Sequence, residues 1–244
     1  MSVGRLLVTR ENETMDMAAI SSFLGLKMNF DVFMGLLFDG FGFTVGIFLI
    51  TLLGSLPLGV IVALARMSKI KPLSFVTGIY ISFMRGTPLM LQLMFIMFAP
   101  YYVFGMTLDA NWKYMACAIG FILNYAAYFA EIYRSGIQSI PKGQYEAATV
   151  LGYTSRQTFM KIIMPQVIKR ILPAMGNEII MLVKDTSLAY VLTIAEMFSA
   201  AKALAAKEVS MIPYLIAAAI YWVACLIIEF ILNKVEKKLS YYHD

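Results

Sequence analysis

The sequence predicts an all-α, polytopic membrane protein with about five transmembrane helices and a helix–turn–helix on the cytoplasmic side. Of its 244 residues, 60% are hydrophobic and only 14% are charged, and the mean hydropathy is +0.75. A soluble domain carries about 25% charged residues, so this composition is typical of membrane proteins. The apolar residues form long runs, while Lys and Arg gather at the ends of the runs and in one long polar interval.

Five apolar runs are candidate spans, because a spanning helix needs about 20 mostly apolar residues. Four of them meet or approach this length, and the second is shorter but almost uncharged and follows an amphipathic segment, 72–84. The predicted spans are 41–65, 88–104, 114–133, 174–194 and 213–233. The first contains a Gly42–Gly46 pair, which suits either close helix packing or no special role, since glycine is common in membrane helices.

Five spans place the two termini on opposite sides of the membrane, and the basic residues indicate which side is which. The connections that hold residues 66–71, 134–172 and 234–238 carry many more Lys and Arg residues than the opposite connections. The positive-inside rule therefore places the N terminus outside and the C terminus in the cytoplasm. Lys and Arg form no basic face with interleaved aromatic residues, so nucleic acid is not an expected partner.

The region before the first span is harder to assign. Residues 17–38 are moderately apolar but interrupted by Lys27, Asn29 and Asp31. We expect an interfacial helix there, with an additional span as the alternative, and the start of the chain does not resemble a cleaved signal peptide. The expected organisation is an N-terminal extracytoplasmic or interfacial segment (1–39), a transmembrane domain (40–235) and a cytoplasmic tail (236–244).

The polar interval 134–172 is expected to fold into two short helices. Pro141 suits the first turn of one helix, and Gly152 can adopt the left-handed conformation that ends it. Thr154 and Gln157 have the spacing of a capping box, which would start the next helix. A compact helix–turn–helix would then project from the membrane, whereas a solvated amphipathic loop is the alternative.

One pattern in this interval has a spacing that helix propensity alone does not explain. Its members are Glu146, Ala147, Ala148, Gly152, Ile162 and Pro165, with Met164 where Leu is usual. The pattern resembles the EAA coupling loop of bacterial ABC-importer permeases, here spanning residues 139–166. The resemblance implies that these six residues form the site that couples the chain to an ATPase subunit. The charge distribution places the same interval in the cytoplasm independently of the motif.

Three further segments are similar to permeases for polar amino acids. They are 83–92, 124–134 and 176–188, and the resemblance extends over roughly residues 40–235. It implies a type I importer subunit in a bacterial cytoplasmic membrane, which moves a polar or charged amino acid into the cell by alternating access. The implied partners are two ATPase subunits, a second copy or a homologous permease, an extracytoplasmic substrate-binding protein, the amino acid and membrane lipid.

The predicted span 174–194 carries three charged residues, Glu178, Lys184 and Asp185. Charges are costly within a bilayer, so they normally face a cavity or a partner. Glu178 and Asp185 are seven residues apart and therefore share one helical face. Glu178 could bind the ammonium group of an amino acid, with a neutral hydrogen bond from Asn124, and Lys184 and Asp185 could line the pathway. Alternatively, the charges satisfy one another across a dimer interface.

Several function classes lack the residues that they require. No GxxxxGK[ST] loop occurs, so ATP hydrolysis is expected from a separate subunit, and the chain itself is not expected to be an enzyme. The single histidine, His243, is nearly terminal, and Cys117 and Cys225 lie within apolar runs, so no catalytic residue, metal site or cofactor is expected. The main alternative is a membrane-embedded enzyme or assembly factor that uses the polar stripe of 174–194.

Overall fold

The computed structural model describes Ser22 and residues 30–239, which form helices joined by short connections. The elements are α2 (Phe30–Arg66), α3 (Lys71–Gly86), α4 (Leu89–Phe104), α5 (Trp112–Gln138), α6 (Lys142–Val150), α7 (Ser155–Gln157), η1 (Thr158–Ile163), α8 (Met164–Asp185), η2 (Thr186–Leu192), α9 (Met197–Glu208) and α10 (Ile212–Leu239). The element η1 is a π-helix and η2 is a 3-10 helix. No strand occurs within the described residues, and the predicted all-α class is confirmed.

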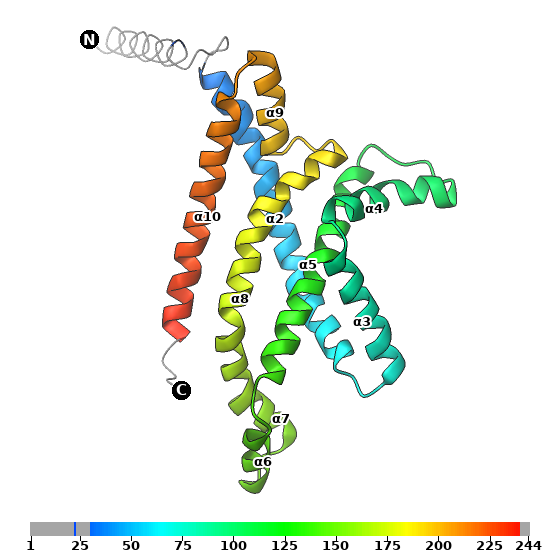
Figure 1. Ribbon diagram of the computed structural model, residues 1–244, viewed down its shortest axis with the longest axis vertical. Helices are drawn as coiled ribbons and strands as arrows, with labels where there is room; N and C mark the ends of the chain where they lie inside the picture. Colours follow the sequence, from blue (N-terminus) through cyan, green and yellow to red (C-terminus); the bar gives the residue numbers. More distant parts are fainter. Residues whose placement is uncertain (1–21, 23–29, 240–244) are drawn as a thin grey trace, which may run out of the picture.

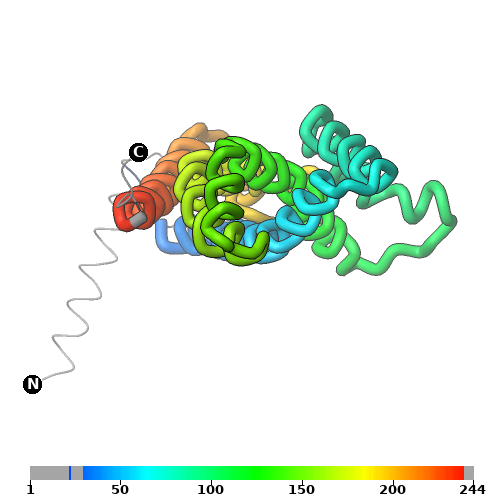
Figure 2. Tube along the Cα trace, turned by 90° about the horizontal axis from the view of Figure 1, so that it is seen from below, coloured from blue at the N-terminus to red at the C-terminus, as the bar shows by residue number. Residues whose placement is uncertain are grey.

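Four long helices, α2, α5, α8 and α10, run roughly along the long axis of the molecule (Figure 1). The short helices α6 and α7 lie together at one end, and α9 lies at the other end beside the start of α2. Helix α4 extends sideways, and a view along the axis shows α3 and α4 on the side opposite α10 (Figure 2). We refer below to the α6 end and the α9 end of the molecule.

Three helices are individually long and apolar enough to cross a membrane, namely α2, α5 and α10. Two helix pairs meet the same criterion only when each pair is taken together. Helices α3 and α4 are bent by 112° at the break between them, and the helix from Ser155 to Leu192 is bent by 61° against α9. The described residues thus contain up to five spans, in agreement with the prediction, but 88–104 and 174–194 are not straight, self-sufficient spans.

The two breaks have local causes that can be read from the backbone. Pro88 has no amide hydrogen and disfavours a helical conformation at the residue before it, and Thr87 accordingly has extended backbone angles. At the second break, Thr193 has a left-handed φ of 55°. The side chain of Glu196 then accepts hydrogen bonds from amides in the first turn of α9, which starts the new helix.

Helix α2 begins at Phe30, so the residues before the predicted first span continue that span. Phe33 and Leu37 are fully buried and belong to an apolar cluster with residues of α9 and α10. Residues 30–38 therefore form the first turns of α2 and not the expected separate interfacial helix, with Phe33 and Leu37 buried in the bundle and Val32, Leu36 and Phe38 exposed. The rest of that expected helix lies outside the described residues, and the domain boundary after residue 39 stays a prediction.

Helix α2 packs against α5 along a seam of small side chains. Its buried members are Thr51, Ser55, Gly59 and Ala63, each four residues from the next. A Cβ atom on Gly59 would lie 2.9 Å from the Cβ of Phe129, so the helices can approach this closely only at a glycine. Apart from its chain neighbours and the adjoining backbone of α2, no atom of the described chain would lie within 4 Å of a Cβ atom on Gly42 or Gly46. The Gly42–Gly46 pair therefore packs against no described helix of this chain.

Candidate functional site

The loop between α5 and α8 contains the predicted helix–turn–helix at the α6 end of the molecule. Helix α6 follows Pro141 and ends before Gly152, whose φ is +80°. The amide of Gly152 donates to the carbonyl of Thr149 at 3.0 Å. The amide of Tyr153 donates to the carbonyl of Ala148 at 3.0 Å, which completes a Schellman motif. The local sequence thus sets the end of α6.

The second helical piece starts with the expected capping box. Oγ1 of Thr154 accepts from the amide of Gln157 at 3.3 Å, and the amide of Thr154 donates to Oε1 of Gln157 at 2.9 Å. From Ser155 the chain continues through α7, η1 and α8 and stays helical to Asp185. One continuous helical rod therefore joins the loop to the middle of the molecule.

The residues of the EAA pattern divide between a surface and a core. Glu146 and Ala147 are exposed on α6, whereas Ala148 is buried. Ile162 packs against an apolar cluster formed by the end of α5, the loop and the start of α8. Pro165 lies in the first turn of α8. The pattern thus divides into an exposed part on α6 and a packed part that holds the loop against α8.

Sequence interpretation missed two large apolar side chains at the tip of this loop. Val150 and Leu151 are 87% and 74% exposed, and they lie directly before the glycine that ends α6. An adjacent apolar pair in an otherwise polar interval was the available signal. Exposed apolar side chains gathered at a projecting tip indicate a surface for a protein partner.

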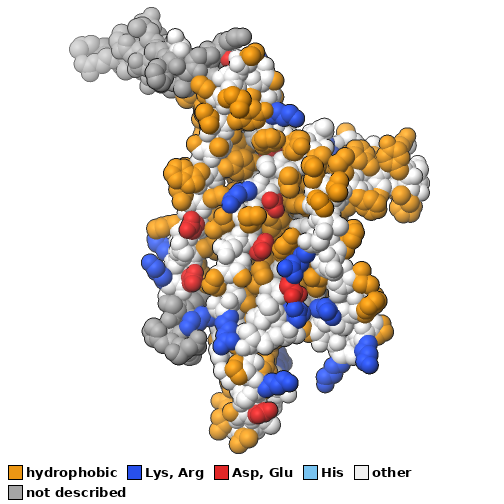
Figure 3. Space-filling model, in the orientation of Figure 1, with side chains coloured by type: hydrophobic (Ala, Val, Ile, Leu, Met, Phe, Trp, Pro, Cys, Tyr) orange, Lys and Arg blue, Asp and Glu red, His pale blue; other side chains and the backbone are white. Residues whose placement is uncertain are grey.

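Charged and aromatic side chains come together in the middle of the molecule. Glu178 and Asp185 are half-buried on α8, and the hydroxyl of Tyr125 on α5 donates to Oδ2 of Asp185 at 2.7 Å. The guanidinium carbon of Arg85, at the end of α3, lies 5.4 Å from the ring centre of Tyr128. Figure 3 shows acidic and basic side chains in the middle of one face, away from both ends. We call these five residues and Lys184 the central polar layer.

The central polar layer contains charges of both signs within interaction range. Arg85 interacts electrostatically with Glu178, and Lys184 interacts with Asp185. Lys184 itself is exposed. The structure thus brings three of the four predicted substrate residues into one layer, together with groups from α3 and α5. Such a layer can bind a small solute that carries both an ammonium and a carboxylate group.

Asn124, the fourth predicted substrate residue, lies near this layer but has other partners. It is buried, and its Nδ2 donates to the carbonyl of Met84 at 3.0 Å and to Oε1 of Gln92 at 2.9 Å. Nε2 of Gln92 donates in turn to the carbonyls of Met84 and Thr87 at 3.0 and 3.1 Å. The two amides therefore satisfy carbonyls that the α3–α4 break leaves free. Pro88, which interrupts the helix, was the sequence feature indicating that backbone carbonyls at this break require other hydrogen-bond donors.

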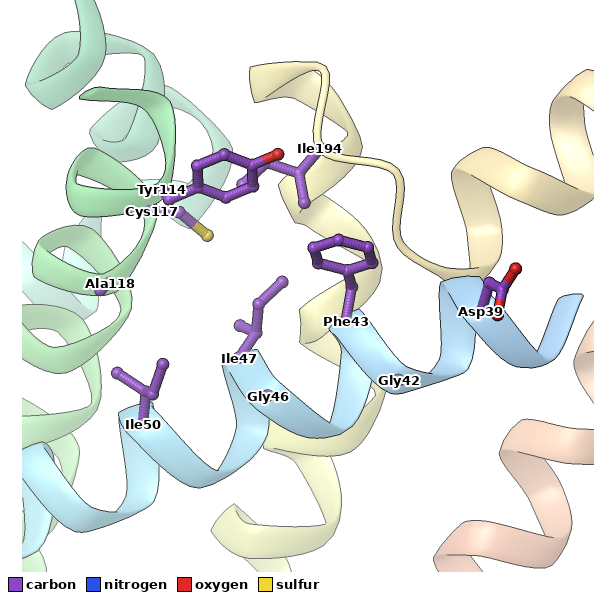
Figure 4. A pocket seen from close by; sticks show the side chains of 10 residues that line it. All are labelled: Asp39, Gly42, Phe43, Gly46, Ile47, Ile50, Tyr114, Cys117, Ala118 and Ile194. Atoms are coloured by element: carbon purple, nitrogen blue, oxygen red, sulfur yellow. The ribbon is translucent and has the colours of Figure 1, made fainter. Parts of the chain in front are cut away.

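An apolar pocket of about 440 Å³ lies apart from the central polar layer, between α2, α5 and the segment before α9. Phe43 and Tyr114 lie near each other at its rim, and Ile47, Cys117 and Ile194 contribute to its wall (Figure 4). Its lining contains none of the residues of the central polar layer. Among the described residues that line this pocket, Asp39 is charged and no Lys or Arg occurs, so the pocket offers no cation for the carboxylate group of a zwitterion. The central polar layer has charges of both signs and is the better candidate for a solute site.

Relatives of known name match most of the chain. The L-cystine transport system permease protein TcyB of Bacillus subtilis (strain 168) is 38% identical over 212 residues, which cover 86% of this chain and 89% of the relative. The arginine transport system permease protein ArtQ of the same organism is 36% identical over 203 residues, covering 83% of this chain and 91% of the relative.

Solved structures agree with this similarity. A crystal structure of an amino acid ABC transporter with histidines contains a chain that is 34% identical, with a TM-score of 0.76 and coverage of 84% of this chain and 94% of that chain. An inward-facing structure of the MetNI methionine ABC transporter has a TM-score of 0.69 at 16% identity, with coverage of 87% of this chain and 100% of that chain, and it shows the shared fold only.

The family described as the binding-protein-dependent transport system inner membrane component matches residues 55–241. This match covers well over half of the chain, and it agrees with the relatives, the solved structures and the helical rod that leads from the loop to the central polar layer. The chain therefore belongs to the family of inner membrane components of binding-protein-dependent transport systems, as a permease subunit of an ABC importer.

Proposed function

We propose that this permease moves a polar or charged amino acid into the cell by alternating access, driven by ATP hydrolysis in a partner subunit. The helical rod from Ser155 to Asp185 carries the proposal, because it joins a projecting partner-binding tip to the central polar layer. The relatives named for cystine and arginine transport support an amino acid as the solute. A rod of this kind can pass a movement of the tip to the solute site.

The solute would bind in the central polar layer. We assign the ammonium group of the amino acid to Glu178 and Asp185, which are half-buried on one face of α8. Lys184 beside them would attract the carboxylate group. Asn124 would support the solute site indirectly. Its side-chain amide donates to the carbonyl of Met84 and to Gln92, and so holds the α3–α4 break in place next to Arg85.

The partners would contact different parts of the chain. One of two ATPase subunits would bind the exposed surface at the end of α6, which is formed by Glu146, Ala147, Val150 and Leu151. A second copy of the permease, or a homologue, would face the exposed stripe of α8 and close the pathway around the central polar layer. That stripe includes Asn177, Met181 and Lys184, which are spaced four and three residues apart.

The same proposal sets the orientation in the bacterial cytoplasmic membrane, with lipid around the bundle. The α6 end and the C-terminal tail would face the cytoplasm, where the ATPase is, and the N terminus would lie outside. The concentration of Lys and Arg in residues 134–172 and 234–238 supports this orientation. The α9 end would then receive the amino acid from the extracytoplasmic substrate-binding protein.

Copurification and reconstitution test the proposal together. The tagged permease, expressed with the ATPase and the binding protein of its own transport system, is expected to retain the ATPase in detergent. After reconstitution into liposomes it should take up radiolabelled amino acids only with ATP and the binding protein. A permease that retains no ATPase, or a complex that hydrolyses ATP but transports no member of an amino acid panel, would contradict the proposal.

A further inference from the structure

Helix α6 is joined to α8 by a reciprocal pair of side-chain amides. Nε2 of Gln144 donates to Oε1 of Gln166 at 3.0 Å, and Nε2 of Gln166 donates to Oε1 of Gln144 at 2.6 Å. Nε2 of Gln166 also donates to the carbonyl of Ile162 at 2.8 Å, which fixes the amide relative to its own helix. Both side chains are partly buried, so water competes weakly for these bonds.

A second contact starts from the same face of α8, one turn further along. Nη1 of Arg170 donates to the carbonyl of Ser139 at 2.7 Å and to its hydroxyl at 3.2 Å. Ser139 is the residue that follows α5, where the last carbonyls of a helix lack helical partners. Gln166 and Arg170 are four residues apart and therefore lie on one side of α8. Both ends of the loop are thus held by the first turns of α8.

The amide pair connects α6 to α8 more directly than the covalent path does. Along the chain, α6 reaches α8 only through the turn at Gly152 and the π-helix Thr158–Ile163. A π-helical segment is rare, occurs mostly as a single turn within an α-helix, and is frequent at functional sites. A movement of α6 along the chain enters the helical rod only after the turn at Gly152, whereas the amide pair joins α6 to α8 directly. Gln166 lies beyond both, and about 18 Å of α-helix, which includes Pro173, separates it from Glu178.

We propose that Gln144 and Gln166 are positioning residues that pass the movement of α6 directly to α8 and so to the central polar layer. The inference rests on the proposed function, because it assumes that an ATPase moves α6. It concerns a different property, the number of solute molecules transported per ATP hydrolysed. Neither side chain is assigned to the ATPase surface or to the solute site.

Substitution of the pair tests this inference in the reconstituted transporter. Gln144→Ala and Gln166→Ala should each lower the ratio of uptake to ATP hydrolysis roughly three- to tenfold, while basal hydrolysis and retention of the ATPase stay at the wild-type level. The double variant should be no worse than either single variant, because both remove the same interaction. The Gln144→Glu/Gln166→Lys variant replaces the amide pair by an ion pair and should restore most of the ratio.

Gln138→Ala is the matched control. Gln138 is an exposed amide at the same end of the molecule, and it accepts a hydrogen bond from Arg134 on its own helix. This variant should leave the ratio unchanged. Additive losses in the double variant, failure of the ion pair to restore the ratio in a complex of normal melting temperature, or loss of the ATPase from Gln144→Ala would each overturn the inference. A wild-type complex without uptake would instead refute the proposed function.

Discussion

Two carboxylates in the membrane-spanning part of this chain differ in their hydrogen bonds. Glu196 is fully buried, accepts from the amides of Phe198 and Ser199 at 2.7 Å each, and accepts from the hydroxyl of Tyr221 at 3.2 Å. Within residues 30–239, no group donates a hydrogen bond to the side chain of Glu178. Glu196 is therefore satisfied as a helix cap, whereas Glu178 remains available for a solute or a partner.

A charge-removing substitution tests this availability. We expect Glu178→Gln to raise the substrate concentration that half-saturates stimulated ATP hydrolysis about tenfold, which corresponds to roughly 1.4 kcal/mol. The amide keeps the size of the side chain but loses the charge that would bind an ammonium group. Hydrolysis is measured against substrate and binding protein in lipid nanodiscs, and assembly with the ATPase is checked by pull-down and should be normal.

Glu229→Gln provides the control for this substitution. Glu229 is an exposed carboxylate on α10, another spanning helix, and is not part of the central polar layer. Its substitution should leave the half-saturating concentration unchanged. If Glu178→Gln gave the same stimulation and uptake as the wild type, Glu178 would be removed from the solute site.

At the scale of elements, the space beside each glycine of α2 shows which faces of the helix pack within this chain and which do not. Gly54 and Gly59 of α2 contact α5 so closely that a Cβ atom would lie 2.7 Å from Ile122 or 2.9 Å from Phe129. Gly46, on the same helix, has open space around it. One helix therefore carries both a tight internal seam and an unoccupied face.

This difference predicts unequal effects of one substitution at two positions. Gly59→Leu should destabilise the purified permease by about 2 kcal/mol or more, because the added side chain must displace backbone in the α2–α5 seam. Gly46→Leu should lower the stability of the permease only slightly, since no side chain of the described residues occupies the space beside Gly46. Thermal unfolding in detergent measures both variants. An equal loss of thermal stability for Gly46→Leu would show that this face of α2 is packed against another part of the protein.

Two glycines of the loop allow a similar comparison, with Gly152 as the test position and Gly143 as the control. Gly152 has a left-handed φ, and a β-branched side chain disfavours that conformation by about 1–2 kcal/mol. Gly152→Val should therefore loosen the end of α6 and lower retention of the ATPase several-fold in pull-downs. Gly143→Ala lies within α6 in open space and should leave retention unchanged or slightly higher. Normal retention by Gly152→Val would argue against a role for the ordered loop in docking.

At the scale of the whole molecule, the two ends differ in charge and in kind of surface. The α6 end carries a projecting tip and belongs to connections rich in Lys and Arg, while the α9 end is formed by a bent helix pair. This asymmetry suits a protein that meets one kind of partner on each side of a membrane. The orientation that we propose follows from the charges and can be measured directly.

Cysteine labelling in intact cells tests the orientation. In a variant without Cys117 and Cys225, Ala110→Cys should react with a membrane-impermeant maleimide, because the connection before α5 would lie outside. Lys142→Cys, at the start of α6, should react only after the cells are opened. Both positions are exposed in the structure, so access to the reagent depends on the side of the membrane. Labelling of Lys142→Cys in intact cells would reverse the proposed orientation.

Local sequence was sufficient for a large part of this fold. Long apolar runs identified the membrane-crossing regions, because the bilayer core must be spanned by apolar helix. Pro141, Gly152 and the Thr154–Gln157 capping box identified the turn of the loop, because each acts on its own or on neighbouring backbone. The charged residues of 174–194 were found for the same reason, since a charge in an apolar run is visible without knowledge of its partner.

Only the tertiary structure decided how these pieces meet. The contacts of Gly59 with Phe129, Asn124 with Gln92 and Tyr125 with Asp185 join residues far apart in the chain. Apolar runs cannot show that 88–104 turns sideways from its neighbour or that the Gly42–Gly46 pair is left open. The sequence by itself therefore determined the membrane-crossing regions, the ends of the loop helices and the family resemblance, which depend on near neighbours. Bends, partners and open faces depend on packing between distant helices, which local patterns do not encode.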